Sequence, residues 1–176
     1  MQSFWNGLSR PFFVMAPLAD VTDPAWRKLV ANSGKPHEIG EPAISRGKPD
    51  VFWTEFVSAD GLYHTREIAK LADRENPLMR DLAFTAEERP IVAQLFSSKP
   101  EMMAYGAKLV ASLGFDGLDI NMGCPDKAIE RQGCGSAMIQ TPEIAQAVIR
   151  AAQEATNLQV SVKTRVGYNK ESLDEW

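Results

Sequence analysis

Apolar segments of strand length alternate along the chain with longer segments whose apolar residues recur every three or four positions. Five segments have the length and apolar content of buried strands: residues 12–18, 51–57, 91–96, 117–122 and 159–167. Three segments have the helical period: residues 24–33, 100–113 and 142–155. Apolar runs without strict alternation are typical of strands covered on both faces. The order therefore predicts a parallel α/β sheet with helical crossovers.

Capping signals mark the ends of the predicted helices. Asp23 stands before Pro24, and Thr141 stands before Pro142. Each pair places a capping side chain ahead of a proline at the first helical position. Gly114 ends the middle helix, because glycine readily adopts the left-handed backbone that follows a helix.

Two connections interrupt the regular repeat. Residues 35–50 contain three prolines and two glycines, which favours a solvated loop or an insertion. Further along, the pattern predicts a charged helical piece at 65–73 and a short additional strand at 78–84. Residues 173–176 have the character of a helix beginning.

Polar residues recur where the predicted strands end: Asp20, Ser58, Gln94, Asn121 with Cys124, and Lys163 with Arg165. The strand ends of a (β/α)8 barrel converge on one mouth, so this pattern favours an α/β fold of the TIM-barrel type. No G-x-G-x-x-G motif follows the first strand, which weakens a dinucleotide-binding alternative. Eight units typically need about 200–250 residues, so we expect only about the first five βα units, a truncated barrel.

Composition excludes several classes of protein. The chain has 176 residues, of which 44% are hydrophobic and 24% charged, as in soluble globular proteins. It has neither the apolar run of about 18 residues that a membrane span needs nor a signal peptide, so we expect a cytoplasmic protein. The net charge of −4 gives no long-range attraction to nucleic acid. Such binding would need a local basic patch or another domain.

The two cysteines, Cys124 and Cys134, lie ten positions apart. Two are too few for a disulfide framework, so free thiols in a reducing compartment are expected. Together with His37 and His64 they show no spacing typical of paired ligands, and no metal site is predicted. The glycine-rich segment 132–136 could let backbone approach a phosphate, but such an isolated motif more often forms a plain loop.

Cys124 is the strongest candidate for chemistry, because it lies between Gly123 and Pro125 in a turn directly after a strand. A thiol held in such a turn can act as a nucleophile, a metal ligand or a proton donor. Alternatively, it is a small buried apolar side chain, as most free cysteines are. No histidine lies near it in sequence to form a thiolate–imidazolium pair, which favours a neutral thiol acting as an acid.

Three polar residues on apolar strands are further candidates. Lys163 and Arg165 alternate on the last predicted strand and could bind an anionic ring or a phosphate group. Alternatively, they could pair with a carboxylate such as Asp119 or Glu55. Gln94 can present a donor and an acceptor to a heteroaromatic edge, or it can be a satisfied interior amide.

Taken together, these segments resemble the motifs of one enzyme family. In chain order they are residues 15–23, 54–59, 94–96, 119–125 and 162–167. From about Phe12 to Gly167 the chain closely resembles the amino-terminal half of the tRNA-dihydrouridine synthases. The most specific part of the resemblance is the sequence Asp-Ile-Asn-Met-Gly-Cys-Pro at 119–125.

The resemblance implies an FMN-dependent barrel oxidoreductase that reduces uridine in tRNA to 5,6-dihydrouridine, with NADPH recharging the flavin. The target base would have to flip out of its stack. Cys124 matches the family's proton donor to C5 of the uracil, while reduced FMN delivers hydride to C6. Family residues that contact the flavin match Ala16, Pro17, Gln94 and Lys163, and those assigned to the substrate match Asn121 and Arg165.

The resemblance also implies what this chain lacks. We expect residues 1–176 to correspond to the amino-terminal portion of the FMN-binding catalytic domain, without the family's carboxyl-terminal helical domain, which grips tRNA. We therefore expect this piece alone to bind FMN and turn over poorly. Cys134 and the long segment 35–50 depart from the family pattern.

Two alternatives stay open at this point. One is another FMN-dependent barrel oxidoreductase, of the dihydroorotate or dihydropyrimidine dehydrogenase type. The other is a non-catalytic half barrel that binds RNA or acts as a scaffold. The sequence predicts neither the target uridine nor the oligomeric state.

Overall fold

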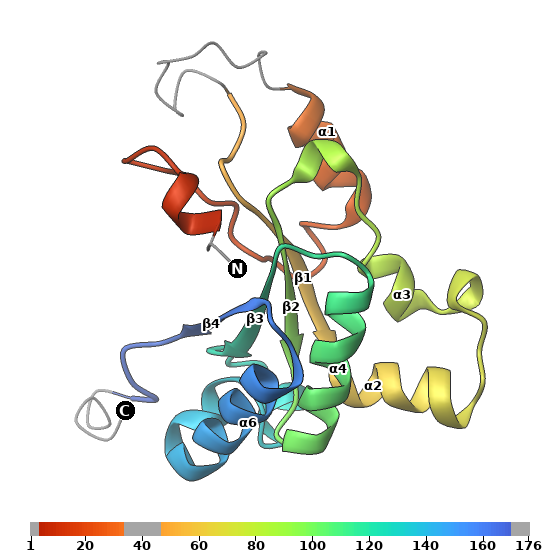
Figure 1. Cartoon of the computed structure of the whole chain (residues 1–176). Helices are drawn as coiled ribbons and strands as arrows, with labels where there is room; N and C mark the ends of the chain where they lie inside the picture. Colours follow the sequence, from red (N-terminus) through yellow and green to blue (C-terminus); the bar gives the residue numbers. More distant parts are fainter. Residues whose placement is uncertain (1–3, 34–46, 170–176) are drawn as a thin grey trace.

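A parallel four-stranded sheet forms the centre of the molecule. The computed structural model describes residues 4–33 and 47–169. Its strands lie side by side in chain order (Figure 1): β1 (Phe52–Ser58), β2 (Ile91–Phe96), β3 (Gly117–Met122) and β4 (Gln159–Thr164). All three neighbouring pairs are parallel. The predicted parallel α/β organisation is therefore confirmed.

Helical crossovers between the strands lie along one side of the sheet (Figure 1). These are α2 (Ala59–Tyr63), which continues into a π-helical turn (His64–Ile68), α4 (Pro100–Ser112) and α6 (Pro142–Ala155). Helix α4 packs against both α2 and α6. The remaining short elements are η1 (Phe4–Gly7), α1 (Pro24–Ser33), η4 (Asp73–Glu75), α3 (Pro77–Asp81), η5 (Ala86–Glu88), α5 (Lys127–Glu130) and η6 (Gly135–Gln140).

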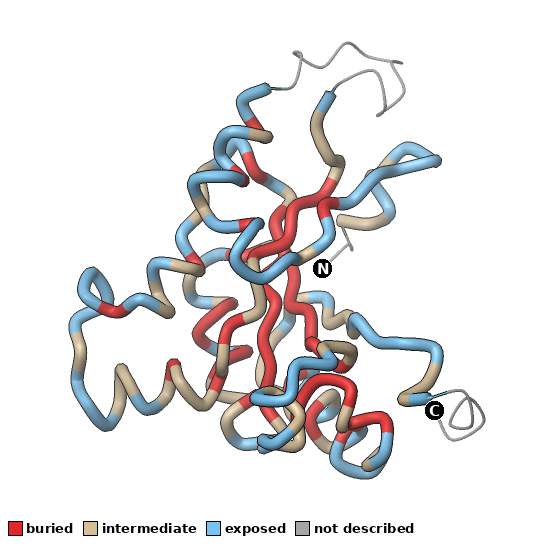
Figure 2. The backbone as a smooth tube through the Cα atoms, turned by 180° about the vertical axis from the view of Figure 1, so that it is seen from behind, coloured by how far each residue is buried: buried red, intermediate tan, exposed pale blue. Residues whose placement is uncertain are grey.

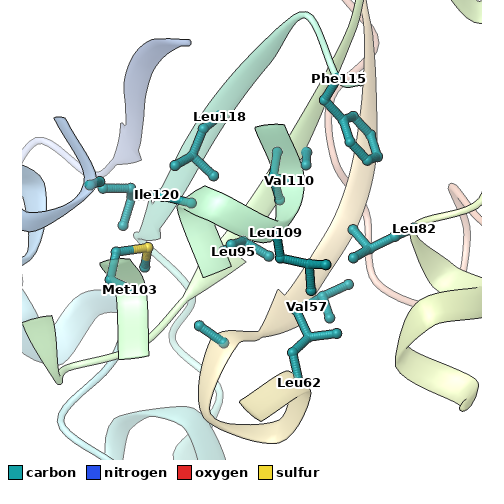
Figure 3. Close-up of a cluster of buried hydrophobic side chains, with 14 of the residues drawn as sticks. Val57, Leu62, Leu82, Leu95, Met103, Leu109, Val110, Phe115, Leu118 and Ile120 are labelled. Carbon is teal, nitrogen blue, oxygen red and sulfur yellow. The ribbon is translucent and has the colours of Figure 1, made fainter. Parts of the chain in front are cut away.

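The hydrophobic core lies between the sheet and these helices. Leu95 on β2 pairs in register with Ile120 on β3, and both are fully buried. Figure 3 shows them with Met103 and Val110 of α4, which belong to the same cluster. Figure 2 shows buried residues following the strands through the centre of the molecule. Because strand side chains alternate between faces, this core leaves the intervening residues on the opposite face.

Aromatic side chains cover the amino end of that opposite face. Trp53 on β1 and Val92 on β2 form a second cluster, against which Phe4 and Trp5 of η1 pack. The rings of Trp5 and Trp53 lie 5.9 Å apart between centroids. The carboxyl end of the same face carries polar side chains instead.

The predicted strand at 12–18 is wrong in extent, because only Val14 forms a bridge, parallel to Val51. The amide of Met15 donates to the Val51 carbonyl at 3.0 Å, and that of Asp50 donates to the Phe13 carbonyl at 2.7 Å. Phe13 is 47% exposed, whereas Met15 is buried at 6% exposure. An apolar run becomes a strand only where successive backbone amides and carbonyls find partners on a neighbouring strand. In this segment of the described structure, such pairing is limited to the bridge at Val14.

The predicted strand at 78–84 is also wrong, because residues 77–81 form helix α3. Asn76 caps this helix by accepting a hydrogen bond from the Leu78 amide at 3.1 Å, and Pro77 occupies its first turn. The helical piece expected at 65–73 begins earlier, at Ala59, because the Ser58 hydroxyl caps α2, and it also ends earlier, at Ile68. The predictions for residues 35–46 and 173–176 lie outside the described residues.

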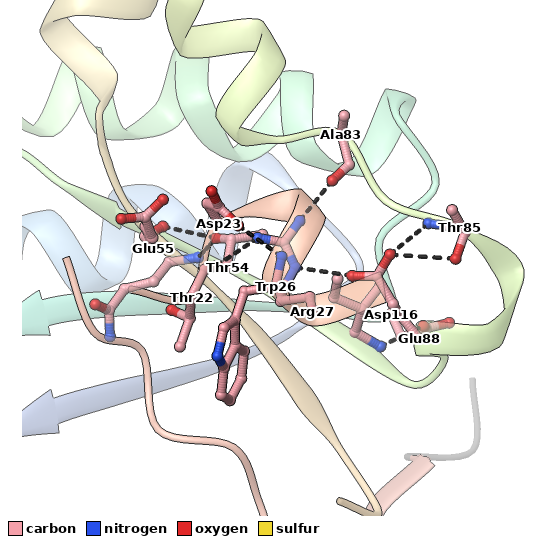
Figure 4. Close-up of polar contacts among 12 residues, drawn as sticks. Thr22, Asp23, Trp26, Arg27, Thr54, Glu55, Ala83, Thr85, Glu88 and Asp116 are labelled. Carbon is pink, nitrogen blue, oxygen red and sulfur yellow. Dashed lines mark hydrogen bonds and ion pairs between the residues drawn. The ribbon is translucent and has the colours of Figure 1, made fainter. Parts of the chain in front are cut away.

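A buried ion pair joins α1 to η5 (Figure 4). Arg27 is fully buried, and its Nε donates to the Glu88 carboxylate at 2.8 Å. Its other nitrogens donate to the carbonyls of Thr22, at 2.8 Å, and Ala83, at 2.5 Å. The second Glu88 oxygen accepts from the Thr85 amide at 2.8 Å. The pair therefore anchors the connection before β1 to the connection before β2.

No helix within residues 4–33 and 47–169 has the length and apolar content required to cross a bilayer.

Candidate active site

Polar side chains from three neighbouring strands lie side by side on the sheet face that points away from the crossover helices. Strand register pairs Gln94 on β2 with Asp119 on β3, and Asp119 with Ser161 on β4. Two residues further along the strands, Asn121 pairs with Lys163. These residues therefore form two adjacent polar rows at the carboxyl end of the sheet.

Hydrogen bonds connect the two rows into one network. Gln94 Nε2 donates to Asp119 Oδ2 at 2.5 Å, and Ser161 Oγ donates to Asp119 Oδ1 at 2.6 Å. Asn121 Nδ2 donates to Gln94 Oε1 at 3.0 Å. Gln94, Asp119 and Asn121 are all buried, at 0%, 2% and 7% exposure, so the amides and the carboxyl group depend on one another for hydrogen bonds.

Burial raises the pKa of Asp119 above its usual range, because the charged form is separated from water. The hydrogen bonds from Ser161 and Gln94 act in the opposite direction, as does the positive charge of Lys163. The carboxylate is thus stabilised by specific donors at a place where water cannot stabilise it.

The Cys124 turn is attached directly to this network. Asn121 Oδ1 accepts hydrogen bonds from the backbone amides of Gly123, at 3.2 Å, and Cys124, at 3.0 Å. On the other side of the turn, Arg165 Nε donates to the Gly123 carbonyl at 2.8 Å. Cys124 itself is half-buried. In the part of the chain that the structure describes, its sulfur makes no hydrogen bond and remains available to a reacting group.

A second loop packs against the same turn. The Ser136 amide donates to the Cys124 carbonyl at 2.9 Å, and the Ser136 hydroxyl lies 3.0 Å from that oxygen and 2.6 Å from Glu130 Oε1. Gly135, at φ +62°, lies so close to the Cys124 carbonyl that a Cβ atom would overlap it. Glycine is required here for two reasons, the left-handed backbone and the close approach.

Substituting Gly135 with alanine is expected to lower the free energy of unfolding by about 2–4 kcal/mol, because a left-handed non-glycine conformation and a backbone clash act together. Gly133→Ala is the matched control, since Gly133 also has a positive φ, +72°, but its added Cβ would meet the Ser98 side chain at an ordinary 3.5 Å. It should lose only about 1 kcal/mol. Urea unfolding measures both, and equal losses would contradict the close packing of the two loops.

Cys134 does not share the environment of Cys124. It is buried, at 2% exposure, and burial raises the pKa of its thiol. Its sulfur lies 3.6 Å from the carbonyl oxygen of Gln132. Both cysteines are free thiols. Cys134 therefore has the character of a packed side chain.

The residues singled out in the sequence occupy different parts of this region. The network brings together Gln94, Asn121 and the Cys124 turn, to which Arg165 is also bonded. Lys163 is exposed beside Asn121 and makes no ion pair with Asp119 or Glu55 within the described residues. Ala16 and Pro17 lie on the segment that follows the Val14 bridge, and their side chains have no polar atom through which to join the network.

Sequence reasoning underestimated Asp119 and missed Ser161. Asp119 was considered only as a possible ion-pair partner, whereas it accepts two hydrogen bonds inside the sheet. The available signal was a carboxylate within an apolar strand, which is costly to bury without partners. Among residues 4–33 and 47–169, no three His, Cys, Asp or Glu side chains are grouped as a metal site would require.

Comparison with known proteins identifies several similar sequences. The family model described as "Dihydrouridine synthase (Dus)" matches residues 14–175. The chain is 41% identical over 175 residues to "Probable tRNA-dihydrouridine synthase 2" of Bacillus subtilis (strain 168), covering 99% of this chain and 47% of the relative. "Probable tRNA-dihydrouridine synthase" of Staphylococcus aureus (strain COL) is 37% identical over 175 residues, with 99% and 46% covered. The chain spans about half the length of the curated relatives it matches.

Proposed function

The chain belongs to the dihydrouridine synthase family, a family of TIM barrels, and from this premise we propose that it forms the amino-terminal portion of a barrel that reduces uridine in tRNA to 5,6-dihydrouridine. The four parallel strands and their crossovers are part of such a barrel. The observation that carries the proposal is the Cys124 turn, whose backbone amides are bonded to Asn121 at the carboxyl end of the sheet. Catalytic groups of TIM barrels lie at this end.

The residues on this face fit an FMN cofactor in charge and in hydrogen-bonding capacity. Lys163 is a cation without an ion-pair partner in the described part of the chain, and it lies in register beside Asn121. A cation in this position would stabilise the negative charge of a reduced isoalloxazine ring. We assign Lys163, Gln94 and the Ala16–Pro17 segment to the flavin. Gln94 is fully buried, so it would act at the floor of the flavin site.

When bound, reduced FMN supplies a hydride for C6 of the uracil, and NADPH restores the reduced flavin. The residues of this chain bind and orient the base and supply the proton. Cys124 transfers its thiol proton to C5, so that hydride and proton together saturate the C5–C6 bond. The turn keeps the sulfur in place, because Asn121 and Ser136 bind the Cys124 backbone from both sides. Asn121 contacts the target base, and Arg165 lies close enough to the turn to contact substrate.

The remaining parts of the proposal concern the whole protein. The partner is tRNA, and a flipped uridine would enter the mouth of the barrel. We place the protein in the cytoplasm. No metal ion is required, because the thiol and the flavin supply all the groups that the reduction needs.

The test supplies the rest of the barrel from a relative. This chain is fused to the part of the Bacillus subtilis relative that follows the matched 175 residues. We expect the purified fusion to be yellow and to form dihydrouridine in tRNA from a strain that lacks the modification, as measured by mass spectrometry. A folded fusion that binds no flavin would contradict the proposal.

Lys163→Met in the same fusion is expected to weaken FMN binding by about tenfold, because it removes the cation beside the ring. Flavin fluorescence quenching measures the affinity. Lys108→Met is the matched control, since Lys108 is an exposed residue of α4, on the far side of the sheet. Equal affinities for the two variants would remove Lys163 from the flavin site.

A further inference from the structure

In the hydrogen-bond network beneath the Cys124 turn, the donors and acceptors leave each amide side chain only one orientation. We call this order of donors and acceptors the direction of the network. We propose that Asp119 is a positioning residue that holds Gln94 in this orientation, so that Asn121 offers an N–H donor to a ring carbonyl of the substrate. The inference rests on the proposed function for the identity of the ring. The direction of the network is derived from the chain alone.

The direction follows from the backbone at one end. The amides of Gly123 and Cys124 can only donate, so the Asn121 atom that faces them must be its oxygen. The Asn121 amide nitrogen therefore faces Gln94 and donates to Gln94 Oε1. Gln94 in turn has only its nitrogen left for Asp119, which must accept. Donors and acceptors thus fix both amide orientations, independently of how nitrogen and oxygen were assigned.

At the end of the network away from the Cys124 turn, Gln94 and Ser161 both donate, so the residue between them must accept twice, as a carboxylate can. Asp119 accepts from Gln94 with one oxygen and from Ser161 with the other. With both oxygens accepting, Asp119 offers no donor to Gln94 and so prevents Gln94 from turning over. If Gln94 turned over, its oxygen would face the carboxylate and its nitrogen would face the Asn121 nitrogen.

This direction has a consequence for recognition. The Asn121 nitrogen carries two hydrogens, one of which is bonded to Gln94. The second has no partner among the described residues, and it belongs to a side chain at the edge of the site, 7% exposed. Asn121 can therefore donate to the C4 carbonyl of uracil but cannot accept from the C4 amino group of cytosine, so it separates the two bases where it meets C4.

The test reverses the network by exchanging two side chains. In the double variant Asp119→Asn/Asn121→Asp, Asn at 119 would donate to Gln94 Oε1, and Gln94 would donate to the new carboxylate at 121. That carboxylate would still accept from the amides of Gly123 and Cys124. The two side-chain bonds of Gln94 are then reversed. The bonds donated by Ser161 and by the two backbone amides keep their direction, and the net charge and the side-chain sizes are unchanged.

Asn121→Asp alone is expected to raise the unfolding equilibrium constant of the chain by about 10–100-fold at pH 8, because Gln94 then lies between two carboxylates. One of them must bind a proton, so the folded state binds more protons than the unfolded state and stability falls as pH rises above about 4. The charged group acting on Asp119 is Lys163 on β4, and the uncharged groups bonded to Asp119 are Gln94 on β2 and Ser161 on β4.

The double variant is expected to recover stability to within about threefold of the unchanged chain and to lose the added pH dependence. Asn121→Asp combined with Asp126→Asn is the matched control. Asp126 caps α5 outside the network, so this pair should not recover. Additive effects in the Asp119/Asn121 cycle, measured by urea unfolding, would overturn the assigned direction.

Base preference tests the donor at 121 separately. Both forms are tested in the fusion. Fluorescence anisotropy with single-stranded oligouridine and oligocytidine should show that the double variant favours uridine over cytidine at least tenfold less than the unchanged fusion does. An unchanged ratio would overturn the donor assignment. If the flavin-binding fusion formed no dihydrouridine, the proposed function would fail, while the outcome of the stability cycle would stand by itself.

Discussion

Replacing Cys124 with alanine in the fusion is expected to lower the rate of dihydrouridine formation by about 10²–10⁴-fold, because it removes the acid that protonates C5. The free energy of unfolding should change by less than about 1 kcal/mol, since the side chain is half-buried and its sulfur makes no hydrogen bond within the described residues. Single-turnover oxidation of the reduced flavin by tRNA measures the chemical step, and FMN affinity should be unchanged.

Cys134→Ala is the control for this prediction. It removes a thiol ten positions away that is buried and faces the Gln132 carbonyl. Loss of a packed side chain should cost stability, on the order of 1–2 kcal/mol, with little change in the rate of the chemical step. If Cys124→Ala kept the full rate, or if Cys134→Ala lost it, Cys124 would not be the proton donor.

Arg27→Met is expected to have the largest effect on stability, a loss of about 3–5 kcal/mol in the free energy of unfolding. The substitution leaves the Glu88 carboxylate buried without its cation, and it also leaves the carbonyls of Thr22 and Ala83 without their donor. Both members of the pair are almost completely buried, at 0% and 1% side-chain exposure. Chemical denaturation of the chain measures the loss.

Two comparisons make this prediction specific. Arg66→Met breaks an ion pair with Asp73 whose side chains are 25% and 51% exposed, and it should cost no more than about 1 kcal/mol. Arg27→Met combined with Glu88→Leu removes both buried charges and should recover part of the loss. A small effect of Arg27→Met alone would show that the connection before β1 contributes little to folding.

Local patterns in the sequence were sufficient for most of the secondary structure. The four strands of the sheet and helices α4 and α6 occur where the apolar periodicity predicts them. Helix α4 begins at Pro100, and α6 begins at Pro142 after Thr141, as the capping signals indicate. These features depend on interactions between residues a few positions apart, so the local sequence is sufficient to predict them.

The two errors in secondary structure have different causes, one in the spatial neighbours of the segment and one in a local capping signal. Residues 12–18 have the composition of a strand, but within the described structure only Val14 finds a paired backbone. Residues 78–84 are apolar enough for a strand, yet Asn76 and Pro77 start a helix there, and this capping signal was overlooked. Periodicity in a short apolar run cannot distinguish these cases.

The sequence by itself determined the parallel α/β class, the candidate Cys124 and its family motif. Only the tertiary structure decided that Asp119, Gln94 and Asn121 form one directed network beneath that cysteine. The physical reason is strand register, which places residues 25 positions apart directly opposite one another. A sequence shows which side chains can donate and accept, whereas the paired strands decide which of them meet.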